Sequence, residues 1–191
     1  MNRKFKISVN APVTLGFAGL CLIATVLGIV SGGRITRAVF MTSHTSLLNP
    51  LTWLRFFTHV LGHSGLSHFV GNASLLLLLG PQIEEKYGAK VLIGVILVTA
   101  FVTGLFNYLL FPHIGLCGAS GVVFAFILLA SFTGFREGEI PLTFILVAVI
   151  YLGQEIYSGI FINDNISNMA HILGGVIGGA AGYLLNKEGK K

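Results

Sequence analysis

The stretch VLIGVILVTAFVTGLFNYLLFPHIGLCGASGVVFAFILLASFTGF, residues 91–135, contains no charged side chain. A helix that spans a membrane needs roughly 20 apolar residues, so this stretch is too long for a single span. Phe111–Pro112–His113, followed by a glycine-rich turn, divides the stretch in two. The sequence therefore predicts two consecutive membrane helices, over about 89–110 and 118–134.

Uncharged stretches also lie on both sides of this one, at residues 7–33, 64–83, 140–154 and 165–186. They predict four more helices, over about 11–31, 68–80, 140–157 and 168–185, and the second of the six is expected to stop at Gly80–Pro81. In the whole chain 54% of the residues are hydrophobic and only 10% are charged, against about 25% charged residues in soluble domains. The expected fold is all-α, a polytopic membrane protein with six transmembrane helices.

The chain is expected to form one domain. A six-helix bundle would occupy residues 11–186, between short basic cytoplasmic tails at 1–10 and 187–191. The first helix is interpreted as retained, because its apolar core exceeds the roughly 7–15 residues of a signal peptide and no A-x-A-like cleavage site follows. The connection 32–67 is long for a compact domain. Its aromatic residues predict a position partly in the membrane interface.

The net charge of +5 is interpreted as a topology signal, and no nucleic-acid partner is expected. If the spans alternate in direction, nine of the 12 Lys and Arg residues fall on one side, which leaves Arg34, Arg37 and Arg55 for the other. Basic residues favour the cytoplasmic side of a membrane. Both termini are therefore expected in the cytoplasm, in agreement with an even number of spans.

Four polar residues lie near the starts of predicted helices: His68, Asn72, Ser120 and His171. Such residues are costly within a membrane, and each is by default a candidate for function. The second, fourth and sixth helices begin on the same side, so the four residues share one depth, in the outer leaflet if the termini are cytoplasmic. A serine is a poor nucleophile until a base accepts its proton, and His171 can be that base for Ser120.

Hydrogen-bond donors for a tetrahedral oxyanion are predicted close to the same serine. The first turn of a helix leaves its backbone N–H groups free, and Ser120 opens its helix. His68 and Asn72 are four residues apart and share one helix face. Their side chains can supply further donors of the kind that stabilise the oxyanion of acyl transfer.

The segment AHILGGVIG, residues 170–178, predicts a close contact between two helices. Gly174 and Gly178 lie on the helix face of His171, and small residues at this spacing let membrane helices approach closely. Close approach of the fourth and sixth helices would bring Ser120 and His171 within hydrogen-bond range.

In their order along the chain, these segments resemble the rhomboid intramembrane serine proteases, from Trp53 to the C-terminus. The matching segments are WLR (53–55), HSGLSHFVGN (63–72), EEKYG (84–88), GASG (118–121) and AHILGGVIG (170–178). The resemblance implies a catalytic dyad of Ser120 and His171 with no third acid. It also implies an oxyanion hole formed by His68, Asn72 and the backbone N–H of Ser120.

The resemblance further implies residues with structural roles. Trp53 and Arg55 would belong to a first loop embedded in the membrane, and Glu84 to a hydrogen-bond network near the cytoplasmic end of the second helix. His59 and His63 would stabilise the fold.

Two features differ from the best-known rhomboid proteases. Phe124 stands where the family often has tyrosine, so its ring can stack on His171 but offers no hydroxyl group. No added cytosolic domain or seventh helix is expected, so the chain resembles the minimal six-helix bacterial form.

The expected function is that of an intramembrane serine endopeptidase in the bacterial inner membrane, with its active site open to the outer side. Its partners would be the lipid bilayer and single-pass transmembrane substrates, with no cofactor and no metal. By resemblance, substrates carry helix-weakening residues and a small residue before the cleaved bond. The short apolar core of the fifth helix favours substrate access past that helix.

Three alternatives remain open. Six histidines could indicate a metal-dependent protease or transporter, although the zinc motif H-E-x-x-H is absent. A non-catalytic protein of the same fold could bind membrane clients, although the presence of both Ser120 and His171 argues against it. Cys117 could compete as nucleophile, although nothing marks it as electropositive enough to form a thiolate. Cys117 and Cys21 are both expected to be buried structural thiols.

Overall fold

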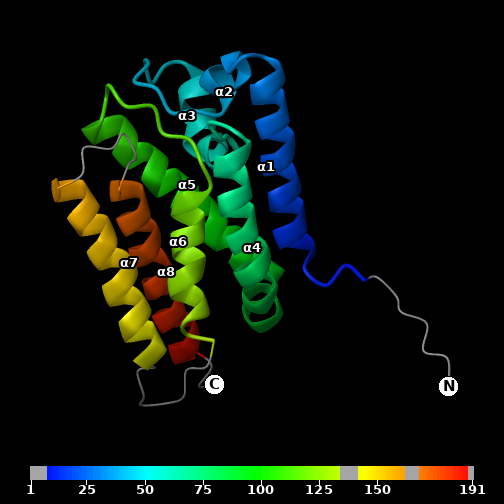
Figure 1. Ribbon diagram of the computed structural model, residues 1–191, viewed down its shortest axis with the longest axis vertical. Coiled ribbons are helices and arrows are strands. Elements are labelled where there is room, and N and C mark those ends of the chain that lie inside the picture. Colours follow the sequence, from blue (N-terminus) through cyan, green and yellow to red (C-terminus); the bar gives the residue numbers. More distant parts are fainter. Residues whose placement is uncertain (1–7, 134–141, 162–167, 189–191) are drawn as a thin grey trace.

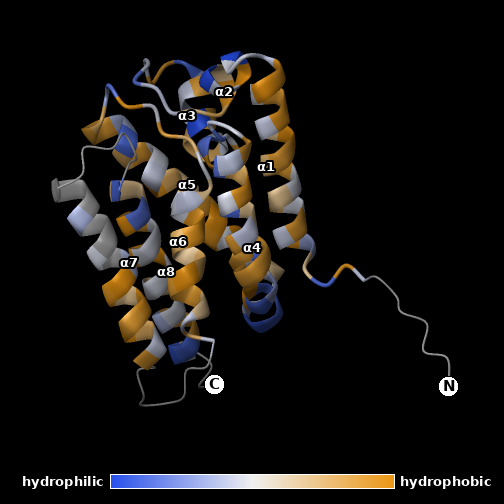
Figure 2. Cartoon of the chain, in the orientation of Figure 1, coloured by the Kyte–Doolittle hydropathy of each residue, from blue (hydrophilic) through white to orange (hydrophobic). Residues whose placement is uncertain are grey.

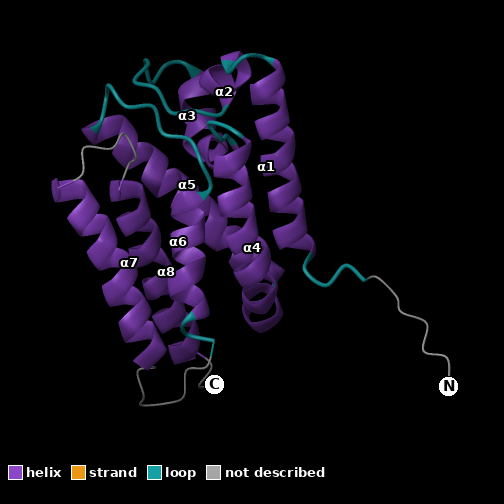
Figure 3. Cartoon of the chain, viewed as in Figure 1, coloured by secondary structure: helices purple, strands orange, loops and turns teal. Residues whose placement is uncertain are grey.

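A computed structural model describes residues 8–133, 142–161 and 168–188 of the chain. Within these ranges all regular secondary structure is helical, joined by loops, with no strand (Figure 3), which confirms the predicted all-α class. The helices are α1 (Pro12–Val30), α2 (Arg34–Val39), α3 (Pro50–Thr58), the 3-10 helix η1 (His59–Leu61), α4 (Leu66–Tyr87), α5 (Ala89–Leu110), α6 (Ser120–Ala130), α7 (Leu142–Phe161) and α8 (Asn168–Glu188).

Four of the described helices are long and apolar enough to cross a membrane, namely α1, α4, α5 and α8. Hydrophobic residues run along the helices, and hydrophilic residues gather toward the two ends of the bundle (Figure 2). The chain is therefore an integral membrane protein, as predicted. α6 and the first half of α7 are shorter apolar helices. The predicted count of six spans depends on those two helices and stays a prediction.

α6 is the central helix of the bundle. It contacts α4, α5, α7 and α8, while α1 packs on the far side of α4 and α7 lies at an edge (Figure 1). Residues 121–129 of α6 are all buried. A helix surrounded by others on all sides is expected to be apolar all round, and this explains why residues 121–130 include no charged residue.

The predicted end of the second helix at Gly80–Pro81 is wrong, because α4 continues through Pro81 to Tyr87. Proline removes one backbone hydrogen bond, but membrane helices tolerate it where neighbouring elements support the helix. Here α1 packs against α4, and a Cβ atom at Gly80 would lie only 2.4 Å from Thr14 Cγ2. Packing against α1 therefore overrides the local stop signal.

Glu84, in the last turns of α4, binds the N-terminus of α1. Its Oε1 accepts a hydrogen bond from Val13 N at 2.9 Å, and its Oε2 accepts from Thr14 N at 3.0 Å and Thr14 Oγ1 at 2.9 Å. The N-cap residue of α1 is Ala11, whose side chain cannot accept a hydrogen bond. A helix N-terminus also favours a negative charge. Glu84 thus caps one helix from another, the kind of structural role that the resemblance implied.

We expect Glu84→Ala to lower the free energy of unfolding by about 3 kcal/mol, because bonds to a charged acceptor are lost and buried N–H groups of α1 remain unpaired. Unfolding of the purified protein in detergent measures the loss. Glu85→Ala is the matched control, because the neighbouring Glu85 is exposed, and its effect should stay within about 0.5 kcal/mol. Equal losses in the two variants would contradict the capping role.

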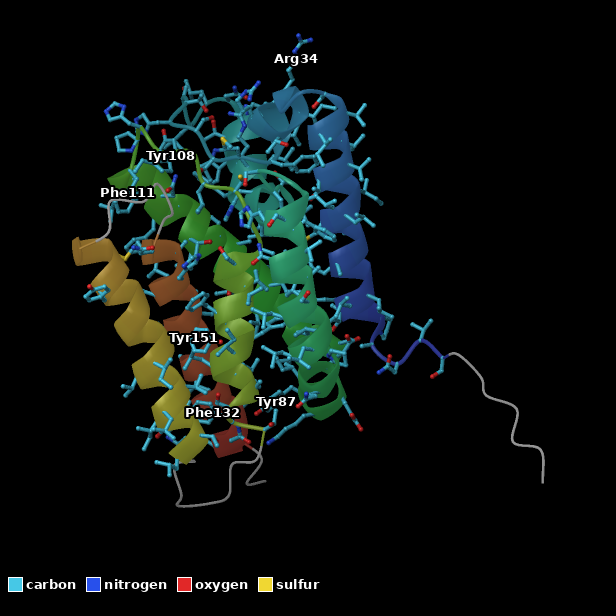
Figure 4. All side chains as sticks on the ribbon, in the orientation of Figure 1. Arg34, Tyr87, Tyr108, Phe111, Phe132 and Tyr151 are labelled. Carbon is cyan, nitrogen blue, oxygen red and sulfur yellow. The ribbon has the colours of Figure 1, made fainter. Side chains whose placement is uncertain are left out.

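The predicted connection 32–67 is structured, since it contains α2, α3 and η1. Arg55 of α3 is buried, and its guanidinium donates hydrogen bonds to Ala38 O at 2.7 and 2.9 Å and to Ser43 Oγ at 2.7 Å. Trp53, two residues earlier in the same helix, is 47% exposed. Arg55 therefore fastens α3 to the chain around the end of α2, at the end of the bundle where Arg34 also lies (Figure 4).

The opposite end of the bundle holds the start of α1 and the end of α8 (Figure 1). Lys86 lies there, at the end of α4, and its Nζ donates to Phe132 O at 3.1 Å and to Thr133 O, just beyond the end of α6. A cation at a helix C-terminus is favourable. Most of the two predicted basic tails, together with residues 134–141, lies outside the described residues.

Candidate active site

Ser120 and His171 lie together at the starts of their helices. Ser120 is the first residue of α6, and His171 is in the first turn of α8. His171 Nε2 lies 2.7 Å from Ser120 Oγ, and both residues are partly buried. An unprotonated imidazole nitrogen at this distance can accept the proton of the hydroxyl group. The pair has the geometry of a nucleophile and its base.

α6 and α8 touch through glycines below this pair. A Cβ atom at Gly174 would lie 2.0 Å from Gly121 O, and one at Gly178 would lie 2.0 Å from Ala125 O. Real Cβ atoms essentially never come this close to another atom. Any larger residue at either position would therefore push the two helices apart. This is the close approach that AHILGGVIG predicted.

Phe124 packs against the ring of His171. The two ring centroids are 4.6 Å apart and the ring planes differ by only 2°, so the rings are stacked. Phe124 is one turn after Ser120 and is buried. The stacking agrees with the expectation for this position, and it limits the rotation of the imidazole that faces Ser120.

His68 and Asn72, both on α4, lie beside Gly118. A Cβ atom at Gly118 would lie 2.9 Å from His68 Nε2 and 3.8 Å from Asn72 Nδ2. Gly118 also has φ +133°, a conformation that L side chains rarely adopt. Glycine is therefore needed here for both space and conformation, and it keeps the two α4 side chains next to the segment that leads into Ser120.

Three groups near Ser120 can donate hydrogen bonds, His68 in the tautomer that carries its proton on Nε2. His68 Nδ1 lies 3.1 Å from Ser64 Oγ, so its Nε2 remains for the side facing Gly118. Within the described part of the chain, the buried Asn72 Nδ2 has no hydrogen-bond partner. The N–H of Ser120 opens α6 and lacks an intrahelical acceptor. An unpaired buried donor is costly, so this arrangement suits an incoming oxygen atom that carries negative charge.

The four predicted site residues border one cavity of about 810 Å³. Its other lining residues are Met41, Ser64, Gly65, Ser67, Gly115, Leu116 and Cys117. Burial raises the pKa of the Cys117 thiol, which favours the protonated and less nucleophilic form. Ser120 is therefore the better placed nucleophile in this cavity, because it alone of the two contacts a base at 2.7 Å.

The loop between α5 and α6 enters the bundle and carries the chain to Ser120 (Figure 1). Asn107 Nδ2 donates to Ile114 O and to Thr42 Oγ1, both at 2.8 Å. Thr42 also exchanges two hydrogen bonds with the backbone of Leu116. The sequence interpretation missed both anchors. Asn107 is a polar residue in an apolar span, and this signal could have identified it. No comparable signal in the sequence marks Thr42.

His59 and His63 hold the same loop immediately before Ser120. The carbonyl oxygen of His59 accepts a hydrogen bond from Gly118 N at 3.0 Å. His63 Nε2 accepts from Ala119 N at 3.4 Å. Both histidines are buried, and they support the segment that leads into Ser120, in agreement with the structural role implied by the resemblance.

We expect the protein to become less stable in mild acid. Burial lowers the pKa of His59 to about 4, and that of His63 also to about 4, whereas the unfolded chain titrates near pH 6.5. As the pH falls below about 6.5, the unfolded chain binds protons that the folded chain does not. The free energy of unfolding should therefore fall, for His59 by about 2 kcal/mol between roughly pH 7.5 and pH 5.

Unfolding in detergent across this pH range measures the effect. His59→Gln removes one titrating ring, so its stability should vary less with pH than that of the unmodified protein. The same pH dependence in both proteins would show that His59 is not responsible.

Comparison with known proteins shows which family the chain belongs to. The family described as the Rhomboid domain matches residues 50–188, a range that includes all four predicted site residues. The chain belongs to the rhomboid family. The resemblance drawn from the sequence is thereby confirmed, while the minimal six-helix form stays a prediction.

Rhomboid relatives are known from animals and bacteria. The chain is 33% identical over 142 residues to Rhomboid-related protein 1 of Caenorhabditis elegans. This match covers 69% of the chain and 39% of the relative. It is 28% identical over 171 residues to Rhomboid protease GlpG of Yersinia pestis (strain Pestoides F). This match covers 87% of the chain and 60% of the relative. The chain thus spans less than two thirds of the length of these rhomboid relatives.

Proposed function

We propose that this rhomboid is an intramembrane serine endopeptidase that cleaves transmembrane segments of single-pass membrane proteins. The observation that carries the proposal is the 2.7 Å contact between His171 Nε2 and Ser120 Oγ. The same cavity is lined by Asn72, whose Nδ2 has no hydrogen-bond partner among the residues that the structure describes. The similarity to a relative named as a protease supports it.

The proposed reaction begins with attack of Ser120 Oγ on the carbonyl carbon of the scissile bond. His171 Nε2 takes the hydroxyl proton at the same time. The carbonyl oxygen becomes an oxyanion, to which His68, Asn72 and the N–H of Ser120 donate hydrogen bonds. His171 then passes its proton to the departing amine, and an acyl ester remains on Ser120.

Hydrolysis of this ester completes the cycle. His171 takes a proton from a water molecule, the resulting hydroxide attacks the ester carbon, and Ser120 regains a proton as the carboxylic acid product leaves. The backbone carbonyls of a substrate helix are occupied by intrahelical hydrogen bonds. The substrate must therefore unwind locally around the scissile bond, and helix-weakening residues in a substrate would favour this step.

We further propose that the cavity opens to the outer side of a bacterial inner membrane. Arg34, Arg37 and Arg55 lie at the α2–α3 end of the bundle, whereas Lys86, Lys90 and Lys187 belong to helix ends at the opposite end. Together with the further basic residues of the predicted tails, the positive-inside rule puts the α2–α3 end outside and both termini in the cytoplasm. The proposed chemistry needs no cofactor, metal or nucleic acid.

A non-catalytic role in binding membrane clients is the alternative function. Such a role would not require a serine hydroxyl and an imidazole in contact, so the Ser120–His171 geometry favours the enzyme. The metal-dependent alternative would need a group of ligands. Within residues 8–133, 142–161 and 168–188, no three His, Cys, Asp or Glu side chains are placed so that they could hold a metal ion.

Reconstitution into liposomes tests the proposal. The purified rhomboid would be mixed with a single-pass test substrate whose transmembrane segment carries a small residue and a helix-weakening residue, and the fragments would be sized by mass spectrometry. We expect two fragments from one cut within or beside the membrane segment, with the same rate after metal chelation. Binding without fragments would favour the client-binding alternative. Cleavage that stops on chelation and returns with zinc would favour the metal-dependent one, and either result would overturn the proposal.

A further inference from the structure

We propose that Tyr151 of α7 is a positioning residue for His171, acting through the ring of Phe124. The inference rests on the proposed role of His171 as the catalytic base. Tyr151 contacts Phe124 and is not among the described residues that line the cavity around Ser120. Its effect would be on the orientation of the base.

Three rings, those of Tyr151, Phe124 and His171, contact one another in sequence from α7 to the dyad. The ring of Phe124 lies parallel to the imidazole of His171 at 4.6 Å. Tyr151 packs edge-on against the same phenylalanine, with centroids 5.6 Å apart and planes at 85°. Stacked and edge-to-face pairs are both favourable aromatic geometries. Each ring thus limits the movement of the next.

Phe124 depends on such a neighbour because it has no polar group. A tyrosine at this position could be fixed by a hydrogen bond from its hydroxyl, whereas a phenylalanine ring is held in place by packing alone. One face of Phe124 contacts His171, and Tyr151 supplies an aromatic neighbour from a different helix. Removing Tyr151 would let Phe124 turn away from the parallel position and leave the imidazole less restricted.

Tyr151 belongs to the inner side of α7. Phe144, Val147, Ala148 and Tyr151 pack against the core at helical spacing, whereas Val149 on the opposite side is 66% exposed. Phe144 contacts Phe132, just beyond the end of α6, with ring centroids 4.3 Å apart. In Figure 4, Tyr151 lies nearer the middle of the bundle and Phe132 nearer its lower end. Of these two aromatic contacts made by α7, only that of Tyr151 involves a ring that contacts His171.

A small serine-directed fluorophosphonate tests the inference, because this probe requires no transmembrane substrate. Inactivation of the full chain in detergent gives two constants, the maximal inactivation rate and the probe concentration at half that rate. We expect Tyr151→Ala to lower the maximal rate roughly 3- to 10-fold, the factor that corresponds to an aromatic pair. The half-saturating concentration should change little, because the cavity wall is unaltered.

Three further variants separate positioning from general damage. Tyr151→Phe keeps the aromatic edge and should restore the maximal rate to within about twofold, whereas Tyr151→Leu keeps apolar volume without the ring and should resemble Tyr151→Ala. Val149→Ala, on the exposed side of the same helix, should leave both constants unchanged. Unfolding measurements on each variant would show that the compared proteins are folded.

A double-variant cycle shows whether Tyr151 acts through Phe124. In a Phe124→Ala background, Tyr151→Ala should cause little additional loss. The same loss in both backgrounds, or an unchanged maximal rate in Tyr151→Ala and Tyr151→Leu, would overturn the inference and leave the proposed function intact. Absence of any reaction at Ser120 in the unmodified protein would instead overturn the proposed function, and this inference with it.

Discussion

Ser120→Ala is expected to reduce cleavage of a single-pass substrate by roughly 10⁴- to 10⁶-fold, the loss typical of removing a serine nucleophile. Alanine has no oxygen atom that could attack the scissile carbonyl or carry the acyl ester. His171→Ala should cause a loss of similar order, because the hydroxyl group then keeps its proton. The double variant should be no worse than either single variant, since the two residues act as one unit. Initial rates of fragment formation in liposomes measure all three.

Ser67→Ala is the matched control, because Ser67 lines the same cavity. Its cleavage rate should stay within about threefold of that of the unmodified protein. A substantial residual rate in Ser120→Ala would contradict the assignment of Ser120 as nucleophile. A complete loss in Ser67→Ala would instead indicate that a different serine acts.

Gly174→Ala is expected to have the second largest effect, although Gly174 makes no contact with substrate in the proposed reaction. Its new Cβ would lie 2.0 Å from Gly121 O, 2.8 Å from Gly121 C and 3.1 Å from Gly121 Cα. Because these are backbone atoms, which cannot rotate away, α6 and α8 must move apart by about 1 Å. A displacement of that size at a catalytic pair can lower the rate about 10²-fold, and the strain should cost about 1–3 kcal/mol of stability.

Gly179→Ala provides the control for this prediction. Gly179 is on the same helix, but a Cβ there would meet its nearest atom, Phe144 Cε2, at 4.0 Å, an ordinary contact. We expect unchanged cleavage and up to about 1 kcal/mol of added stability, because alanine is the better helix former. Comparable losses in the two variants would mean that helix separation at Gly174 does not control the Ser120–His171 contact.

The long apolar helices, and the polar residues proposed as the site, could be read from the sequence for a physical reason. Membrane helices need long apolar runs, and the same apolar background makes polar residues such as Asn72 and His171 conspicuous. The structure places both of them, with His68 and Ser120, around one cavity. Their catalytic roles stay proposals until the variants are measured.

Other features depend on contacts between distant segments and could not be predicted locally. The stop signal at Gly80–Pro81 failed because α1 packs there and Glu84 caps α1. The role of Thr42 depends on its contacts with Asn107 of α5 and with Leu116 of the loop before α6, both far away in the sequence. In the same way, α7 is apolar along most of its length, so the sequence offers no sign that Tyr151 contacts Phe124.

Mass-spectrometric peptide mapping after treatment with a fluorophosphonate tests the central claim most directly, because it identifies the nucleophile by its covalent adduct. The Ser120–His171 dyad predicts one adduct, on Ser120, that is lost in His171→Ala and retained in Cys117→Ser. An adduct on Cys117 or on a different serine, or modification of Ser120 that proceeds equally fast in His171→Ala, would contradict the dyad.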